Sequence, residues 1–145
     1  MRTDLYDERF ELPATPARVM AILEDIPAWP TWANGVSKAF RSRNWTTLRV
    51  GARFGFVPKF LHLPIVVAVL EYEPERRLVW GTRTPLGSIA HGLELSPAGD
   101  GRCQVHHYEQ AKGLLSLSTR LLARQIEAFD RELTRDLQAR VATDR

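Results

Sequence analysis

The sequence has only one cysteine and no long uninterrupted apolar run. Cys103 alone can form neither an internal disulfide nor a cysteine-based metal site. The longest mostly apolar stretch, residues 60–70, is interrupted by His62 and Pro64 and is far too short to cross a bilayer. No apolar segment follows the first residues, Met1 to Asp4, so no secretory signal is visible. These absences favour a cytoplasmic protein.

The signature motifs of several enzyme classes are also missing. The chain contains no phosphate-binding loop, no dinucleotide-binding glycine fingerprint, no nucleophile elbow and no zinc-ligand spacing. We therefore expect no cofactor, and the motifs leave open whether the protein is an enzyme.

Lysine is scarce, and the positive charge is carried almost entirely by arginine. The chain has 20 basic and 17 acidic residues, which gives a net charge of +3. The arginines are scattered along the chain and interleaved with acids, whereas a nucleic-acid-binding protein usually gathers its cations into one stripe with aromatic residues between them. The sequence therefore predicts no nucleic-acid partner.

The composition is that of one soluble globular domain. The chain has 145 residues, of which 44% are hydrophobic and 26% charged. No repeat, low-complexity tract or linker divides it. We expect a single domain over residues 1–145, monomeric or homodimeric.

The first third of the chain predicts a strand and two helices. Partial alternation over 5–12 indicates a strand. Thr15 followed by Pro16 is typical of a helix start, because the threonine oxygen caps the helix and proline lacks only an N–H that would be unpaired. Apolar residues at spacings of three and four then predict one buried helix face. Residues 28–33, with Trp29 and Trp32, indicate a second, short helix.

The remainder predicts six strands and one long helix. The strands are expected over 36–46, 51–57, 64–73, 76–84, 87–95 and 103–110, and short connections make their sheet antiparallel. From about Leu114 to the end, a stripe of apolar residues at helical spacing indicates one helix: Leu122, Ile126, Phe129, Leu133, Leu137 and Val141. The fold expected is α+β, with a curved seven-stranded antiparallel sheet wrapped around the C-terminal helix and two short helices closing one end.

Several segments of this chain resemble one superfamily over nearly its whole length. They are residues 13–19, 23–32, 73–80, 95–97 with 100–101, 105–109 and 112–113. In these segments and in element order the chain resembles the START-related SRPBCC superfamily, which has the helix-grip fold, and especially its polyketide cyclase/dehydrase and lipid-transport branch. The resemblance implies a cavity between the sheet and the long helix that holds an apolar or aromatic small molecule. It is specific for the fold and does not choose among the functions of the superfamily.

A polar cluster is expected on the concave face of the last hairpin. His91 shares a strand face with Leu93, and His107 and Glu109 share one with Val105. If the turn places Leu93 opposite Val105, His91 falls opposite His107, with Cβ atoms about 4.5–5.5 Å apart. Glu109 then lies two residues along the same face.

Three interpretations of His91, His107 and Glu109 stay open. A carboxylate beside a histidine suits acid/base chemistry near neutral pH. Two histidines and a carboxylate also suit a non-haem iron. The third interpretation is a hydrogen-bonded polar patch that orients a ligand or simply satisfies inward side chains.

Strand alternation and helix spacing also predict the wall of the cavity. The expected ligand-binding residues are Trp45 at the edge, Phe54, Phe56, Trp80, Thr82, His91, Leu93, His107, Glu109, Leu122 and Ile126. The mouth is expected at Phe60, Leu61 and Leu114. Arg53 and Arg83 are expected to point outward, which leaves no cation to stabilise an enolate in the cavity.

Three functions follow from these residues and the resemblance. The leading hypothesis is a carrier or sensor that binds a hydrophobic or aromatic small molecule, such as a lipid, an isoprenoid or a polyketide-like compound. The alternative is a polyketide cyclase/aromatase with His91, His107 and Glu109 as its acid/base set. A third is an accessory protein that acts through its surface, for which the apolar loop around Phe60 indicates contact with a membrane or a partner.

Overall fold

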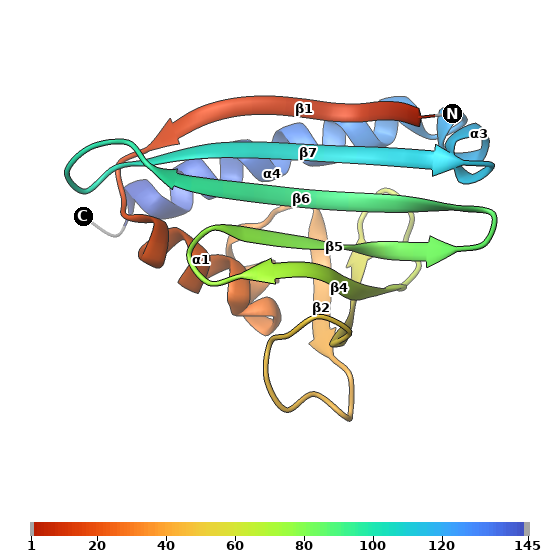
Figure 1. Cartoon of the computed structure of the whole chain (residues 1–145), viewed down its shortest axis with the longest axis horizontal. Helices are drawn as coiled ribbons and strands as arrows, with labels where there is room; N and C mark the ends of the chain where they lie inside the picture. Colours follow the sequence, from red (N-terminus) through yellow and green to blue (C-terminus); the bar gives the residue numbers. More distant parts are fainter. Residues whose placement is uncertain (1, 144–145) are drawn as a thin grey trace.

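The computed structural model describes residues 2–143 and contains one antiparallel sheet of seven strands (Figure 1). The strands are β1 (Arg2–Leu12), β2 (Val36–Arg41), β3 (Arg53–Pro58), β4 (Ile65–Glu73), β5 (Arg77–Thr84), β6 (Gly87–Pro97) and β7 (Cys103–Gly113). Their order across the sheet is β1-β7-β6-β5-β4-β3-β2. The α+β helix-grip fold expected from the sequence is confirmed.

The helices before β2 follow the prediction closely. They are α1 (Pro16–Glu24), a 3-10 turn η1 (Ile26–Ala28) and α2 (Trp29–Trp32). Thr15 caps α1, because its hydroxyl accepts a hydrogen bond from the N–H of Arg18 at 3.2 Å. The buried side chains of α1 and α2 pack into the core at one end of the sheet.

The predicted single C-terminal helix is wrong in one respect, because two helices are present. They are α3 (Leu115–Arg120) and α4 (Ala123–Ala142). The backbone of Leu122 has φ −111° and ψ 10°, which departs from helical values and changes the helix direction. Only α4 carries the apolar stripe of Leu133, Leu137 and Val141 into the core. It lies across one face of the sheet behind β1, β7 and β6 (Figure 1).

The register of the last hairpin also differs from the prediction. Leu95, not Leu93, lies opposite Val105, and His91 lies opposite Glu109. The ladder extends to the pair Pro97 and Cys103, so the turn begins later than expected. A shift of two residues leaves every side chain on its predicted face, since strand faces alternate with a period of two.

The turn before β2 holds α4 in place. The backbone N–H and the side-chain amide of Asn34 both donate to the carboxylate of Asp136, at 2.7 and 3.0 Å. A Cβ at Gly35 would lie 2.9 Å from Glu132 Oε1 and 3.1 Å from a ring carbon of Phe129. A side chain at this position would therefore have to displace Glu132 and the ring of Phe129.

Within residues 2–143, no helix is both long and apolar enough to cross a membrane.

Candidate functional site

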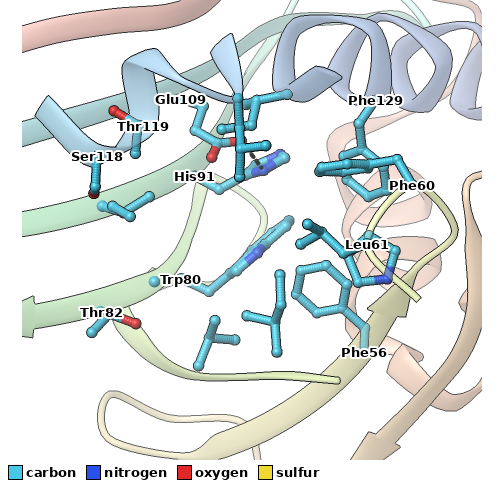
Figure 2. A pocket seen from close by; sticks show the side chains of 17 residues that line it. Phe56, Phe60, Leu61, Trp80, Thr82, His91, Glu109, Ser118, Thr119 and Phe129 are labelled. Atoms are coloured by element: carbon cyan, nitrogen blue, oxygen red, sulfur yellow. Dashed lines mark ion pairs between the residues drawn. The ribbon is translucent and has the colours of Figure 1, made fainter. Parts of the chain in front are cut away.

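A largely apolar cavity of about 300 Å³ lies between the sheet, the α3–α4 junction and the β3–β4 loop (Figure 2). Its walls come from five strands, β3 to β7, the β3–β4 loop and both C-terminal helices. The lining residues are Phe56, Pro58, Phe60, Leu61, Ile65, Val67, Trp80, Gly81, Thr82, Ile89, His91, Glu109, Ser118, Thr119, Leu122, Ile126 and Phe129. This volume and lining suit one small, mainly hydrophobic molecule.

Nine of the residues predicted for the wall or mouth line this cavity. They are Phe56, Phe60, Leu61, Trp80, Thr82, His91, Glu109, Leu122 and Ile126. Five others predicted for the wall or mouth lie outside it: Trp45, Phe54, Leu93, His107 and Leu114. Strand and helix spacing thus placed these residues on the face toward the cavity, but did not show which side chains reach the cavity itself.

The residues outside the cavity have clear alternative positions. Phe54 and Leu93 are fully buried core residues, and Phe54 packs edge-on against Trp29 with ring centroids 5.5 Å apart. Trp45 packs against Phe54, 6.4 Å between ring centroids. Leu114 points into solvent with 57% of its surface exposed. Phe54 therefore supports the wall that other side chains form.

Aromatic rings build the two sides of the cavity. The rings of Trp80 and His91 stack nearly parallel, with centroids 4.4 Å apart and planes 15° apart. Across the cavity, Phe129 of α4 stacks on Phe56 at 6.3 Å and meets Phe60 at 5.8 Å (Figure 2). The β3–β4 loop is thus folded back onto α4, and Phe60 closes that side of the cavity.

The two histidines meet even though they are not directly opposed. His91 Nε2 and His107 Nε2 are 2.7 Å apart, a hydrogen-bond distance. His107 has no exposed surface and lies outside the cavity lining. Burial lowers the pKa of His107 well below its ordinary value of 6.5, and the neighbouring His91 and His106 add to this effect. His107 is therefore neutral near pH 7.

Two carboxylates face the other nitrogen of His91. Its Nδ1 lies 3.2 Å from Glu109 Oε1 and 3.5 Å from Asp130 Oδ1. Burial raises the pKa of Glu109, but the hydrogen bond and charge of His91 and the contact with Asp130 outweigh it, so this pKa lies below its ordinary value. Glu109 is the ionised member of the pair.

Asp130 behaves in the opposite way. It is fully buried on α4, and its carboxylate oxygens have no hydrogen bond of normal geometry with any residue in the described part of the chain. Burial raises its pKa well above the ordinary value of 3.8, and the negative charge of Glu109 adds to this. Of the two carboxyl groups, Asp130 therefore keeps its proton to higher pH, which limits the repulsion beside Glu109.

A continuous chain of hydrogen bonds extends from β1 to the cavity. The hydroxyl of Tyr6 lies 2.8 Å from Thr134 Oγ1, which lies 2.8 Å from His107 Nδ1. Each hydroxyl and each ring nitrogen along this chain can serve as donor or acceptor, so the hydrogen bonds can run in either direction. Tyr6, Thr134, His107 and His91 are therefore connected from β1 to the cavity wall.

The same geometry bears on the metal interpretation. His91, His107 and Asp130 each offer one ligand atom, and these atoms lie within 4.8 Å of one another. Two histidine nitrogens bound in adjacent positions to one octahedral non-haem iron ion would lie about 3 Å apart. The 2.7 Å between the imidazole nitrogens is instead the length of a hydrogen bond.

Sequence reasoning missed three members of this network, namely Tyr6, Asp130 and Thr134. The helical spacing already contained a signal for two of them. Asp130 lies four residues after Ile126, and Thr134 lies three residues before Leu137, so both fall on the buried side of α4. The position of a carboxylate on the buried face of an amphipathic helix was the signal that could have identified Asp130.

The arrangement leaves Glu109 as the group that presents charge to the cavity. His91 uses Nε2 toward His107 and Nδ1 toward the carboxylates, and Trp80 covers a face of its ring. The side chain of Glu109 retains 12% exposure and lines the cavity. Ser118 and Thr119 add hydroxyl groups (Figure 2). Arg53 and Arg83 are exposed, as predicted.

Comparisons with known proteins agree with this architecture. The chain is similar to a START superfamily protein from Mycobacterium smegmatis, with 12% identity, a TM-score of 0.73 and coverage of 97% of this chain and 98% of that one. It is also similar to the Zhui aromatase/cyclase from Streptomyces sp. R1128, with 9% identity, a TM-score of 0.74 and coverage of 98% and 94%. At these identities the likeness concerns the fold.

A search of curated proteins found no match. A model of the family described as polyketide cyclase/dehydrase and lipid transport matches residues 5–142. With nearly its whole length matched, this chain belongs to the polyketide cyclase/dehydrase and lipid transport family.

Proposed function

We propose that the protein binds a hydrophobic or aromatic small molecule without covalent chemistry, as a carrier or sensor, and that the ligand donates a hydrogen bond to Glu109. The observation that carries this proposal is a single ionised carboxylate in an otherwise apolar cavity. A hydroxyl, phenol or amine on the ligand would satisfy that carboxylate, whereas a purely hydrocarbon ligand would leave it unpaired.

The engagement of the histidines supports binding over catalysis. Both nitrogens of His91 already have partners inside the protein, and His107 lies outside the cavity. A general acid or base must reach the proton that it transfers. Among the three residues considered for acid/base work, Glu109 alone meets this requirement, and it is held ionised.

One observation favours cyclase or dehydratase chemistry as a second function. Glu109 and Asp130 are adjacent carboxyl groups with pKa values shifted in opposite directions, which is a pattern seen in acid/base pairs. Asp130, however, is fully buried and does not line the cavity. A proton from Asp130 would have to pass through Glu109 or His91 to reach the cavity, so this function is supported less well.

A matched pair of probes tests the proposal directly. By calorimetry, 2-naphthol should bind more tightly than its methyl ether, 2-methoxynaphthalene, by about tenfold, because only the phenol donates a hydrogen bond to the carboxylate. Glu109→Met should abolish most of this difference, because methionine offers no oxygen to accept the hydrogen bond, and Trp80→Ala should weaken the binding of both compounds. The proposal is wrong if neither compound binds, or if the preference for the phenol persists in Glu109→Met.

Identification of the natural ligand separates the two functions. Native mass spectrometry and organic extraction of the purified protein should release a hydrophobic compound with a hydroxyl, phenol or amine group. If the purified protein instead converts a linear poly-β-ketone thioester to an aromatic product, and Glu109→Gln loses this activity, the protein is a cyclase.

A further inference from the structure

Helix α3 is amphipathic in the reverse of the usual sense. Leu114, Leu117 and Leu121 are spaced i, i+3 and i+7, which places them on one side of the helix, and they are 57%, 46% and 85% exposed. The opposite side buries Ser116 and Thr119 against the protein. The leucines of this helix therefore face solvent.

The buried hydroxyls explain why this orientation is stable. Ser116 donates to the carbonyl of Gly113 at 2.8 Å, and Thr119 donates to the carbonyl of Ser116 at 3.0 Å. Both hydroxyls are satisfied locally, so their burial leaves no orphaned polar atom. Small hydroxyl residues also let α3 pack closely on the sheet while the leucines stay outside.

The exposed leucines of α3 continue onto a neighbouring turn and onto the rim of the cavity. The N–H of Leu114 donates to the carbonyl of Leu86 at 2.7 Å, which joins α3 to the β5–β6 turn at one end of the molecule (Figure 1). Leu86 is 61% exposed. Leu122, next to Leu121, is partly exposed and lines the cavity. We refer to Leu86, Leu114, Leu117 and Leu121 as the leucine tip.

The two segments that build the leucine tip carry charges of one sign. No aspartate or glutamate occurs from residue 76 to 93 or from residue 110 to 126, the two segments that build the tip. Arg83, Lys112 and Arg124 are exposed in these segments. On the neighbouring strand β1, Asp4 is ion-paired with Arg2 at 3.0 Å, so the cations remain in excess. A cluster of exposed leucines beside an excess of cations is complementary to a surface that is apolar inside and anionic outside.

We propose that the leucine tip docks on a lipid bilayer that contains anionic lipid. The leucines insert at the boundary between headgroups and acyl chains, and the cations lie among the anionic headgroups. Because Leu122 connects the tip to the cavity, docking also brings the cavity mouth to the bilayer. The docking itself rests on the tip and its charges, whatever the cavity binds.

Vesicle sedimentation tests the proposal with the full chain. Vesicles of phosphatidylcholine with one-third phosphatidylglycerol should bind the protein, and vesicles of phosphatidylcholine alone should bind it much more weakly. The double variant Leu117→Ser/Leu121→Ser should lower binding to the anionic vesicles by about tenfold or more, since it removes two inserted side chains. The double variant Lys112→Gln/Arg124→Gln should lower binding mainly at low salt.

Val66→Ser is the matched control, because Val66 is 52% exposed on β4 and lies outside the tip. It should bind like the unmodified protein, and circular dichroism should show that every variant folds. The proposal is overturned by absence of binding to anionic vesicles, or by equal binding of the leucine double variant. It is also overturned if that variant converts a dimer to a monomer in size-exclusion chromatography, because the tip would then be an interface between two copies.

Discussion

His91 and His107 hydrogen-bond through their Nε2 atoms at 2.7 Å although neither stands opposite the other in the β6–β7 ladder. His91 is paired with Glu109, and His107 is paired with Leu93. The contact is therefore diagonal, and it lets His91 contact a buried histidine and the carboxylate of Glu109 at the same time. One residue thus links the protein interior to the cavity wall.

The burial of Asp130 is expected to lower the free energy of unfolding as the pH rises. Its folded-state pKa is raised above the unfolded value, so the stability it contributes is fully present below that unfolded value and is lost as the pH rises through the folded one. At pH 8 the free energy of unfolding of Asp130→Asn should therefore be higher than that of the unmodified protein by about 1 kcal/mol, and this gain should shrink toward pH 4. Urea unfolding at pH 4, 6 and 8 measures this. A gain independent of pH would show that Asp130 is not the titrating group.

His107 should make the protein sensitive to acid. Its folded-state pKa is depressed, so its contribution to stability is present above the unfolded value of 6.5 and is lost as the pH falls through the folded one. The slope for one such group is at most about 1.4 kcal/mol per pH unit. In urea unfolding between pH 7 and pH 5, His107→Phe should be less stable overall but lose less stability per pH unit. An equally steep loss would assign the acid sensitivity elsewhere.

Thr134 should matter through its two hydrogen bonds. Thr134→Val keeps the shape but leaves the hydroxyl of Tyr6 and Nδ1 of His107 without their partner, and we expect a loss of about 1–3 kcal/mol in the free energy of unfolding. Tyr6→Phe combined with Thr134→Val should cost less than the sum of the single changes, because the two residues share one bond. Thr46→Val, at an exposed position, serves as the control. Additive losses would contradict a connected chain.

Gly35 should control the position of α4 at the cavity. Gly35→Ala adds a Cβ that would lie 3.1 Å from the ring of Phe129, and we expect a loss of about 1–3 kcal/mol in unfolding free energy. Phe129→Leu in the Gly35→Ala background should recover part of this loss by making room. Thermal unfolding of the two single variants and the double variant measures the coupling. No recovery would place the strain at Glu132 instead.

The fold could be predicted from sequence because its elements repeat simple periods. The cap at Thr15, the strand alternation and the stripe from Leu133 to Val141 each depend on residues close in the chain. The break near Leu122 escaped prediction because leucines continue on both sides of it. Their pattern does not reveal that one set faces solvent and the other faces the core.

The site could be predicted only in part, for a related reason. Strand parity placed His91, His107 and Glu109 on one face, and an error of two residues in register did not change that face. Strand alternation shows which face of the sheet a side chain is on, but not whether it reaches the cavity. It therefore did not separate Trp80, which lines the cavity, from Leu93, which is buried in the core. Asp130 belongs to a helix that is distant in sequence from these strands, and its contact with His91 depends on packing.

The pairing of β1 with β7 has a consequence for how the chain reaches its structure. Arg2 lies opposite Lys112 and Leu12 opposite Cys103, so one edge of the sheet joins segments about 90 to 110 residues apart. Contacts this distant in sequence are expected to form late and to slow folding. During synthesis on the ribosome, β1 must wait without its partner strand until β7 has emerged, and in that interval it is exposed to pairing with other chains.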